Sequence, residues 1–228
     1  YAEVQIEEGV LRVDSLRAEL FEGRVSVHAV VDGRQAGGTL PATAEILAEE
    51  IQASGPIREV LEWPLSVYGK VEFSMAVSGA VDSSLHPVKE ALRAEGIVRM
   101  AEGKVVGWTW LQQAASGVGF LGDIDLEEMP IRYLEAPFRV TEEGVFFDSL
   151  SVRAADMDCR LNGSVGSEGR LDCILDVDLP VSRLNAGGMG LGGMLGAFFG
   201  GGSRVPVRVL IGGTTERPQV RVQMLPAK

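Results

Sequence analysis

The chain has 228 residues, of which 46% are hydrophobic and 23% are charged, a balance typical of a folded globular protein and not of a disordered one. Its net charge of −11, with 21 scattered lysines and arginines, argues against nucleic acid or other polyanions as partners. Aromatic residues make up 6% whereas 29 residues are glycine, which favours many turns over a helical bundle. We expect a single β-rich domain over residues 1–228, because all-β architectures often reach this length undivided.

Alternating apolar and polar residues predict strands in the first part of the chain. The segment 11–20 indicates a pair of strands, and residues 25–31 alternate ahead of a turn at Gly33. Residues 39–62 fit a strand followed by a short helix that starts near Ser54, although part of this region also fits one helix face.

The clearest strand signal lies between residues 65 and 79. One side of this segment carries Leu65, Val67, Gly69, Val71, Phe73, Met75, Val77 and Gly79, and the other carries Ser66, Tyr68, Lys70, Glu72, Ser74, Ala76 and Ser78. This period of two predicts a long strand with one apolar face and one polar face. Few helical stretches exist elsewhere in the sequence to pack on the apolar side of this strand. What packs on that side therefore bears directly on function.

The middle of the chain mixes strand and helix signals. Leu85, Val88 and Leu92 have helical spacing and predict a short amphipathic helix after Ser84. A hairpin turn is expected at residues 101–103, followed by a second helix over 108–116. Further strand patterns occur at residues 138–140, 145–147, 150–154, 157–165, 171–179, 205–211 and 220–224. We therefore expect roughly ten to thirteen strands and two or three short helices.

Two cysteines lie in the hairpin formed by residues 157–165 and 171–179, which is closed by the turn Ser167-Glu168-Gly169. If Gly169 adopts the left-handed conformation, Cys159 faces Val177 and Cys173 faces Gly163, so the two sulfurs are too far apart to bond. A different register would bring the cysteines opposite each other. We favour two small buried apolar residues over a disulfide.

A short internal similarity links residues 9–16, GVLRVDSL, with residues 144–150, GVFFDSL. It indicates either a repeated strand-turn-strand unit or no more than common turn residues.

Catalytic and cofactor signals are weak. The two histidines, His28 and His86, lie in unrelated contexts and are interpreted as surface residues, so no enzyme activity is expected. The acidic residues Asp123, Asp125, Glu127 and Glu128 lack the spacing of a calcium loop and fit a solvated loop. The sequence GMGLGG at 188–193 matches a dinucleotide fingerprint without its βαβ context. We therefore expect no metal ion and no cofactor.

Residues 186–202 contain glycines and large apolar residues without any charge. The large apolar side chains are Met189, Leu191, Met194, Leu195, Phe198 and Phe199. The segment is too short and too rich in glycine for a membrane-spanning helix. It fits a flap over an apolar cavity, an interfacial membrane contact, or a glycine-rich connection packed into the core.

Three segments resemble the AsmA-like proteins of the Gram-negative envelope, bacterial relatives of bridge-like lipid transfer proteins. They are residues 9–33 with GVLRVDSLRAELFEGRV, residues 92–107 with the Trp108 segment that follows, and residues 206–222 with a closing strand pair around IGGTTERP. The resemblance implies a long antiparallel sheet curved into an open trough whose apolar concave face holds acyl chains. It also implies a periplasmic protein anchored to the inner membrane that moves phospholipid toward the outer membrane. Because the chain starts without methionine or a signal segment, we expect the anchor to lie in a part of the protein outside this chain.

The hypothesis from sequence is a non-enzymatic module that binds phospholipid or another acyl-chain lipid, with membrane or envelope proteins as further candidate partners. The predicted lipid-contact residues are Val67, Val71, Phe73, Met75, Val77, Leu161, Leu171, Leu175 and Val177. Two alternatives remain. A sandwich or closed barrel would show the same alternation, and a scaffolding module would use its strand edges for protein contacts.

Overall fold

The computed structural model describes residues 1–34, 38–55, 66–107, 128–154, 156–180 and 204–225. These residues form one twelve-stranded antiparallel sheet in which each strand pairs with the next strand in the chain. The strands are β1 (Ala2–Glu7), β2 (Val10–Leu20), β3 (Gly23–Asp32), β4 (Thr39–Gln52), β5 (Ser66–Asp82), β6 (Arg93–Val106), β7 (Glu128–Thr141), β8 (Gly144–Ala154), β9 (Met157–Gly166), β10 (Leu171–Pro180), β11 (Arg204–Gly213) and β12 (Pro218–Met224).

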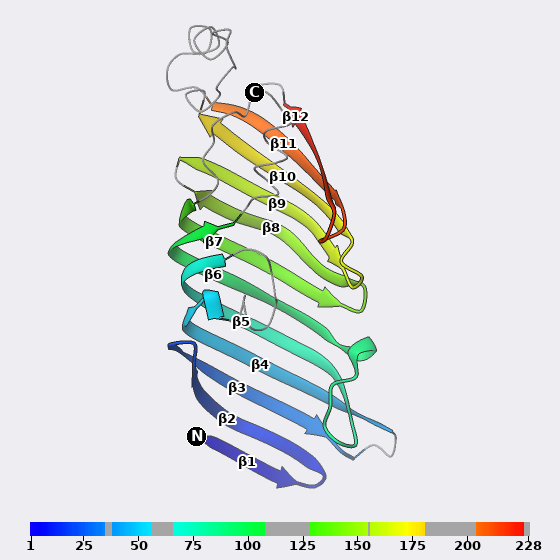
Figure 1. The fold of residues 1–228 in the computed structure, drawn as a ribbon. Coiled ribbons are helices and arrows are strands. Elements are labelled where there is room, and N and C mark those ends of the chain that lie inside the picture. The colour runs from blue at the N-terminus through cyan, green and yellow to red at the C-terminus, as the bar shows by residue number, and fades with distance from the viewer. Residues whose placement is uncertain (35–37, 56–65, 108–127, 155, 181–203, 226–228) are drawn as a thin grey trace, which may run out of the picture.

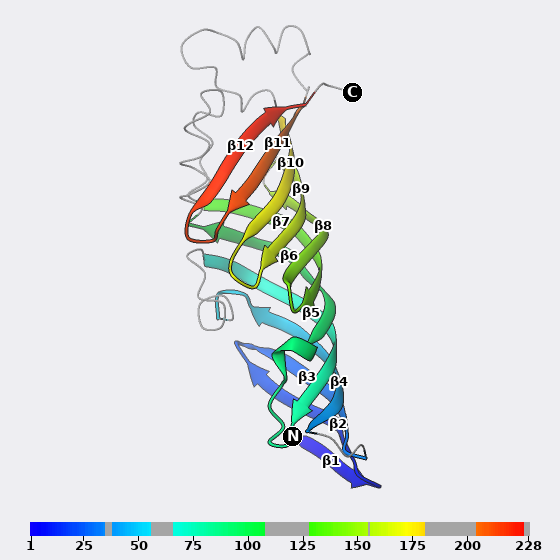
Figure 2. The same cartoon turned by 90° about the vertical axis from the view of Figure 1, so that its right-hand side faces the viewer.

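The sheet is open and curved, with β1 and β12 at its two ends (Figure 1). Strand direction changes progressively between these ends, as expected for the twist of a large sheet (Figure 2). The predicted mainly β fold with a long curved antiparallel sheet is therefore confirmed, and its strands belong to one sheet and not to the two sheets of a sandwich. Within the described residues, no helix is long and apolar enough to cross a membrane.

The amphipathic helix predicted after Ser84 is wrong. The described chain has a single 3-10 turn there, η1 (Lys89–Ala91). The backbone N–H groups of Ser84 and His86 donate to Oδ1 of Asp82 at 2.8 and 3.0 Å. These side-chain-to-backbone hydrogen bonds compete with helix formation. Of the other two predicted helices, 54–62 is described only at Ser54 and Gly55, which are helical, and 108–116 lies outside the described residues.

Two predicted turns are β-bulges inside continuous strands. Residues 11–20 form the single strand β2, with an irregularity between Val13 and Leu16, and residues 101–103 lie within β6 opposite Gly69. A bulge adds one residue to a strand and so shifts the alternation in the same way as a tight turn does. The similarity between residues 9–16 and 144–150 is a repeated structure, because each Asp-Ser pair occupies a bulge, in β2 and in β8.

The polar face of the sheet carries a row of alternating charges across β5 to β12. In register from strand to strand, this row contains Glu72, Arg99, Glu135, Ser151, Arg160, Asp176, Arg208 and Gln223. Arg99 Nε lies 3.0 Å from Glu135 Oε2, and Arg208 binds both oxygens of Asp176 at 2.7 and 2.8 Å. Opposite charges on facing positions disfavour a slip in register, which would place like charges together.

The Asp176→Asn variant is expected to reduce the sensitivity of the protein to acid. The two hydrogen bonds from Arg208 lower the pKa of the Asp176 carboxyl. The stability that this pair contributes is therefore present above the unfolded-state pKa, near 4, and is lost as the pH falls through the lower folded-state value. The difference in Tm between wild type and variant should shrink between about pH 6 and pH 3, measured by circular dichroism. Asp172→Asn on the same strand and face is the control, and a constant Tm difference would contradict the prediction.

Candidate functional site

One face of the sheet is apolar from end to end, and we call it the apolar face. Its central row crosses all twelve strands through residues that pair directly with one another. From β1 to β12 these residues are Ala2, Leu16, Val27, Ile46, Met75, Gly96, Phe138, Phe147, Gly163, Cys173, Ile211 and Val220. The row contains no charged side chain and, apart from the Cys173 thiol, no polar one.

Parallel rows on the same face are equally apolar. One crosses β1 to β10 through Val4, Val13, Ala29, Ala44, Val77, Ala94, Val140, Val145, Val165 and Leu171. Another crosses β5 to β12 through Val71, Met100, Leu134, Val152, Cys159, Val177, Val207 and Met224. Bulges in β2, β4, β6, β7 and β8 maintain this segregation, because each one restores the phase of the strand after the extra residue.

All nine predicted lipid-contact residues lie on the apolar face and are half-buried. Six of them pack against two buried clusters. Leu161, Leu171, Leu175 and Val177 pack on the larger cluster, which is built from β7 to β11, and Val67 and Val71 pack on the smaller one around Met100. Phe73, Met75 and Val77 belong to neither cluster. The middle of β5 is therefore the part of the predicted site that lies outside the two buried clusters.

Burial of the apolar face is deepest on inner strands and shallow at the N-terminal edge. Val207 in β11 is 1% exposed and Met100 in β6 is 2% exposed. By contrast, Leu16 is 40% exposed, Val4 54% and Ile6 74%. The same face thus includes a buried core on inner strands and an accessible apolar surface toward β1.

The strands beside the middle of β5 carry several short side chains, alongside the larger Ile46 and Val98, which pair with Met75 and Phe73 respectively. Phe73 pairs with Ala48, Val77 pairs with Ala44 and Ala94, and Met75 pairs with Gly96. A Cβ atom placed on Gly96 would lie 2.8 Å from Phe138 Cζ, so the ring of Phe138 covers the position that a side chain would otherwise fill. Each of the three larger β5 side chains therefore has an alanine or a glycine directly opposite it on at least one side.

The two cysteines contribute to this apolar face as free thiols. Cys159 faces Val177 and Cys173 faces Gly163, and Gly169 in the turn has a φ of 73°, which confirms the predicted register. Burial raises the pKa of Cys159 to about 12 and also raises that of Cys173. Both side chains are therefore neutral near pH 7 and suit an apolar surface.

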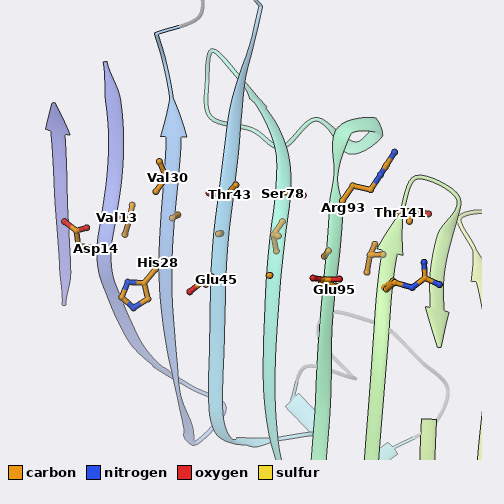
Figure 3. A pocket seen from close by; sticks show the side chains of 17 residues that line it. Val13, Asp14, His28, Val30, Thr43, Glu45, Ser78, Arg93, Glu95 and Thr141 are labelled. Atoms are coloured by element: carbon orange, nitrogen blue, oxygen red, sulfur yellow. The ribbon is translucent and has the colours of Figure 1, made fainter. Parts of the chain in front are cut away.

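A hollow of about 810 Å³ lies on the opposite, polar face between β2 and β7 (Figure 3). A row across the strands places His28 opposite Glu45, then Ala76, then Glu95 opposite Arg139. Ala76 and Ser78 supply a floor of small side chains between the charged residues on β4 and β6. This hollow was not predicted from the sequence, because it is formed by residues on strands that are distant in sequence. The sequence feature that could have indicated the hollow is the run of small residues on the polar side of β5.

The histidines are exposed, as predicted. His28 lies on the polar face of β3, and Nδ1 of His86 is 3.6 Å from Asp82 Oδ2 in the loop after β5. Across the described ranges, no three histidine, cysteine, aspartate or glutamate side chains are placed to hold a metal ion together.

Several predicted features lie outside the described residues: the possible flap residues Met189, Leu191, Met194, Leu195, Phe198 and Phe199, and the acidic residues Asp123, Asp125 and Glu127. No family model, curated protein or solved structure matches the chain.

Proposed function

We propose that this chain is a non-enzymatic module that binds phospholipid or another acyl-chain lipid along its apolar face. In this proposal the module acts in the periplasm, is anchored to the inner membrane by a segment outside this chain, and conducts lipid between the inner and outer membranes. The short segments that resemble AsmA-like proteins support the location in this proposal.

The observation that carries the proposal is the unbroken central row of the apolar face. Neighbouring strands lie about 4.8 Å apart, so a row through twelve strands is roughly 53 Å long. One lipid tail spans about 15 Å, half of the hydrocarbon core of a bilayer. A tail bound along the row would cover a few strands at a time and could move to the next strands without meeting a charge.

Contact with lipid would stabilise the accessible part of this face. Removing apolar surface from water contributes about 25 cal/mol per Å², or about 0.8 kcal/mol for each methylene group. The exposed Val4, Ile6 and Leu16, together with the half-buried middle of β5, offer such surface. The opposite face carries the cross-strand charge pairs and stays in contact with water. A lipid would therefore bind only on the apolar face of the sheet.

A pair of adjacent substitutions tests lipid binding. Phe73→Asp places a charge on the apolar face, outside both buried clusters, and should reduce bound phospholipid by tenfold or more. Ser74→Asp, on the exposed polar face one residue further along, should bind as wild type does. Native mass spectrometry and transfer of a fluorescent phospholipid from vesicles measure the effect.

Circular dichroism must show that both variants keep their strands, since loss of folding in Phe73→Asp alone would point to a packed core there. Wild-type protein that carries no lipid and takes none from vesicles would contradict the proposal.

A scaffolding module is the second candidate function. The specific observation in its favour is strand β1, whose six residues are all exposed at the edge of the sheet. Lipid-free protein that binds an envelope protein through this edge would favour scaffolding over lipid transfer.

A further inference from the structure

Among the residues that the structure describes, the two outer strands of the sheet have no partner on their outer edges. Strands β1 and β12 each pair with one neighbour, at opposite ends of the sheet (Figure 1). Exposed edges of this kind are usually protected by lysine, proline or bulges, because their free N–H and C=O groups attract other strands. Strand β1 contains neither lysine nor proline, and its Val4 and Ile6 are 54% and 74% exposed. At the other end, Met224 of β12 is 52% exposed.

The two edges carry opposite charges. Strand β1 has Glu3 and Glu7 and no basic residue, whereas β12 has Arg221 and no acidic residue. Neighbouring strands inside the sheet pair such charges, as Arg24 does with Glu49 at 3.5 Å and Arg208 does with Asp176 at 2.7 Å. Within the described part of the chain, Glu7 and Arg221 have no ion pair. The β1 edge is therefore negatively charged and the β12 edge positively charged, so the two edges are complementary.

We propose that β12 of one copy pairs with β1 of a second copy, so that the chains assemble head to tail. Because successive strands alternate in direction, β1 and β12 run antiparallel. They can therefore pair in the same way as neighbouring strands within the sheet do. The contact joins two different surfaces and leaves one free edge on each end, so it propagates into a linear assembly.

The side chains select a register for this contact. Placing Val222 opposite Val4 gives six pairs: Ala2 with Met224, Glu3 with Gln223, Val4 with Val222, Gln5 with Arg221, Ile6 with Val220 and Glu7 with Gln219. The apolar pairs then lie on the apolar face, and Arg221 lies diagonally between Glu3 and Glu7 on the polar face. The new ladder is as long as the six-residue ladder between β1 and β2. The apolar faces of the two copies become continuous.

Complementary edge variants test this arrangement. Ile6→Lys blocks the β1 edge, and the double variant Arg221→Glu/Met224→Lys blocks the β12 edge. All of these positions are exposed. Sedimentation velocity over a concentration series at about 0.15 M salt, where distant charges are screened, measures the assembly state. Wild type should form assemblies that grow with concentration, and each variant alone should be a monomer. An equimolar mixture of the two should form a 1:1 dimer, because each variant keeps one intact edge.

Controls separate edge pairing from other association. Val30→Lys, at an apolar position on the interior strand β3 that is 38% exposed, should assemble as wild type does. The Glu3→Arg/Glu7→Arg variant should be monomeric, and adding Arg221→Glu to the same chain should restore assembly. Circular dichroism confirms folding of each variant. Monomeric wild type at the highest soluble concentration would overturn the proposal, as would assembly that Ile6→Lys abolishes while the β12 double variant retains it.

Discussion

The Val207→Asp variant is expected to unfold the C-terminal part of the sheet. Val207 is 1% exposed and lies in the larger buried cluster, where it pairs with Val177 and Met224. None of these neighbours can pair with a carboxylate. A buried charge without a partner costs several kcal/mol, so we expect a loss of about 4 kcal/mol or more in the free energy of unfolding. Urea unfolding followed by circular dichroism measures the loss.

Gln223→Asp provides the matched control for this prediction. Gln223 is exposed on the polar face of β12, opposite Arg208, so the same new charge meets water and a cation. Its effect should stay within about 0.5 kcal/mol. A Val207→Asp protein as stable as this control would show that the C-terminal cluster is not a core.

The comparison of Val207→Asp with Phe73→Asp bears on the proposed function. Both positions lie on the apolar face, but Val207 is inside a buried cluster and Phe73 is half-buried outside both clusters. If the two substitutions destabilised the protein equally, the whole face would behave as one closed core. A large effect at Val207 with a retained fold at Phe73 is what an open lipid-contact surface requires.

Sequence patterns predicted most of the strands, and they predicted the faces of the side chains in β5 and in the hairpin of β9 and β10. The hairpin of β9 and β10 was predictable even in register, because the three-residue turn with Gly169 in the left-handed region fixes which residues face each other. The long alternation of β5 was equally clear, since its period is uninterrupted over the described residues 66–79.

Errors arose where a local pattern is compatible with two structures. The phase shift at Asp14-Ser15 fits both a turn and a bulge, and only the pairing with β1 and β3 decides for the bulge. The spacing of Leu85, Val88 and Leu92 fits a helix, but the Asp82 carboxylate holds the preceding N–H groups in a turn. In both cases a contact with another residue outweighs the local pattern.

The open sheet itself could not be derived from alternation alone. A sandwich shows the same apolar and polar faces along each strand, and the difference lies in which strands pair. Here each described strand pairs with its sequence neighbours, so the twelve apolar positions of the central row align on one surface. The polar hollow around Ala76 has the same origin, because Glu45 and Glu95 become neighbours of β5 only through strand pairing.

Gly163→Ala, in the central row of the apolar face on β9, is expected to destabilise the sheet strongly. Gly163 has a φ of 144°, which side chains rarely adopt, and a Cβ atom there would lie 2.5 Å from Cys173 Cα and closer still to the Asp172 carbonyl oxygen. The clash is with the backbone of β10, which cannot move without breaking the ladder. Backbone strain and overpacking each cost about 1–3 kcal/mol, so we expect a loss of about 3 kcal/mol or more in the free energy of unfolding.

Gly212→Ala on β11 separates this effect from the general one of replacing glycine in a strand. At Gly212 the nearest atom to a new Cβ is the Leu171 carbonyl oxygen at 3.9 Å, so alanine fits without a shift. It should leave stability unchanged or raise it by about 0.4–1 kcal/mol, because alanine restricts the unfolded chain. Equal urea midpoints for the two variants would contradict the close approach of β9 and β10. A selective loss in Gly163→Ala would establish that the apolar row depends on direct backbone contact where Phe147, Gly163 and Cys173 meet.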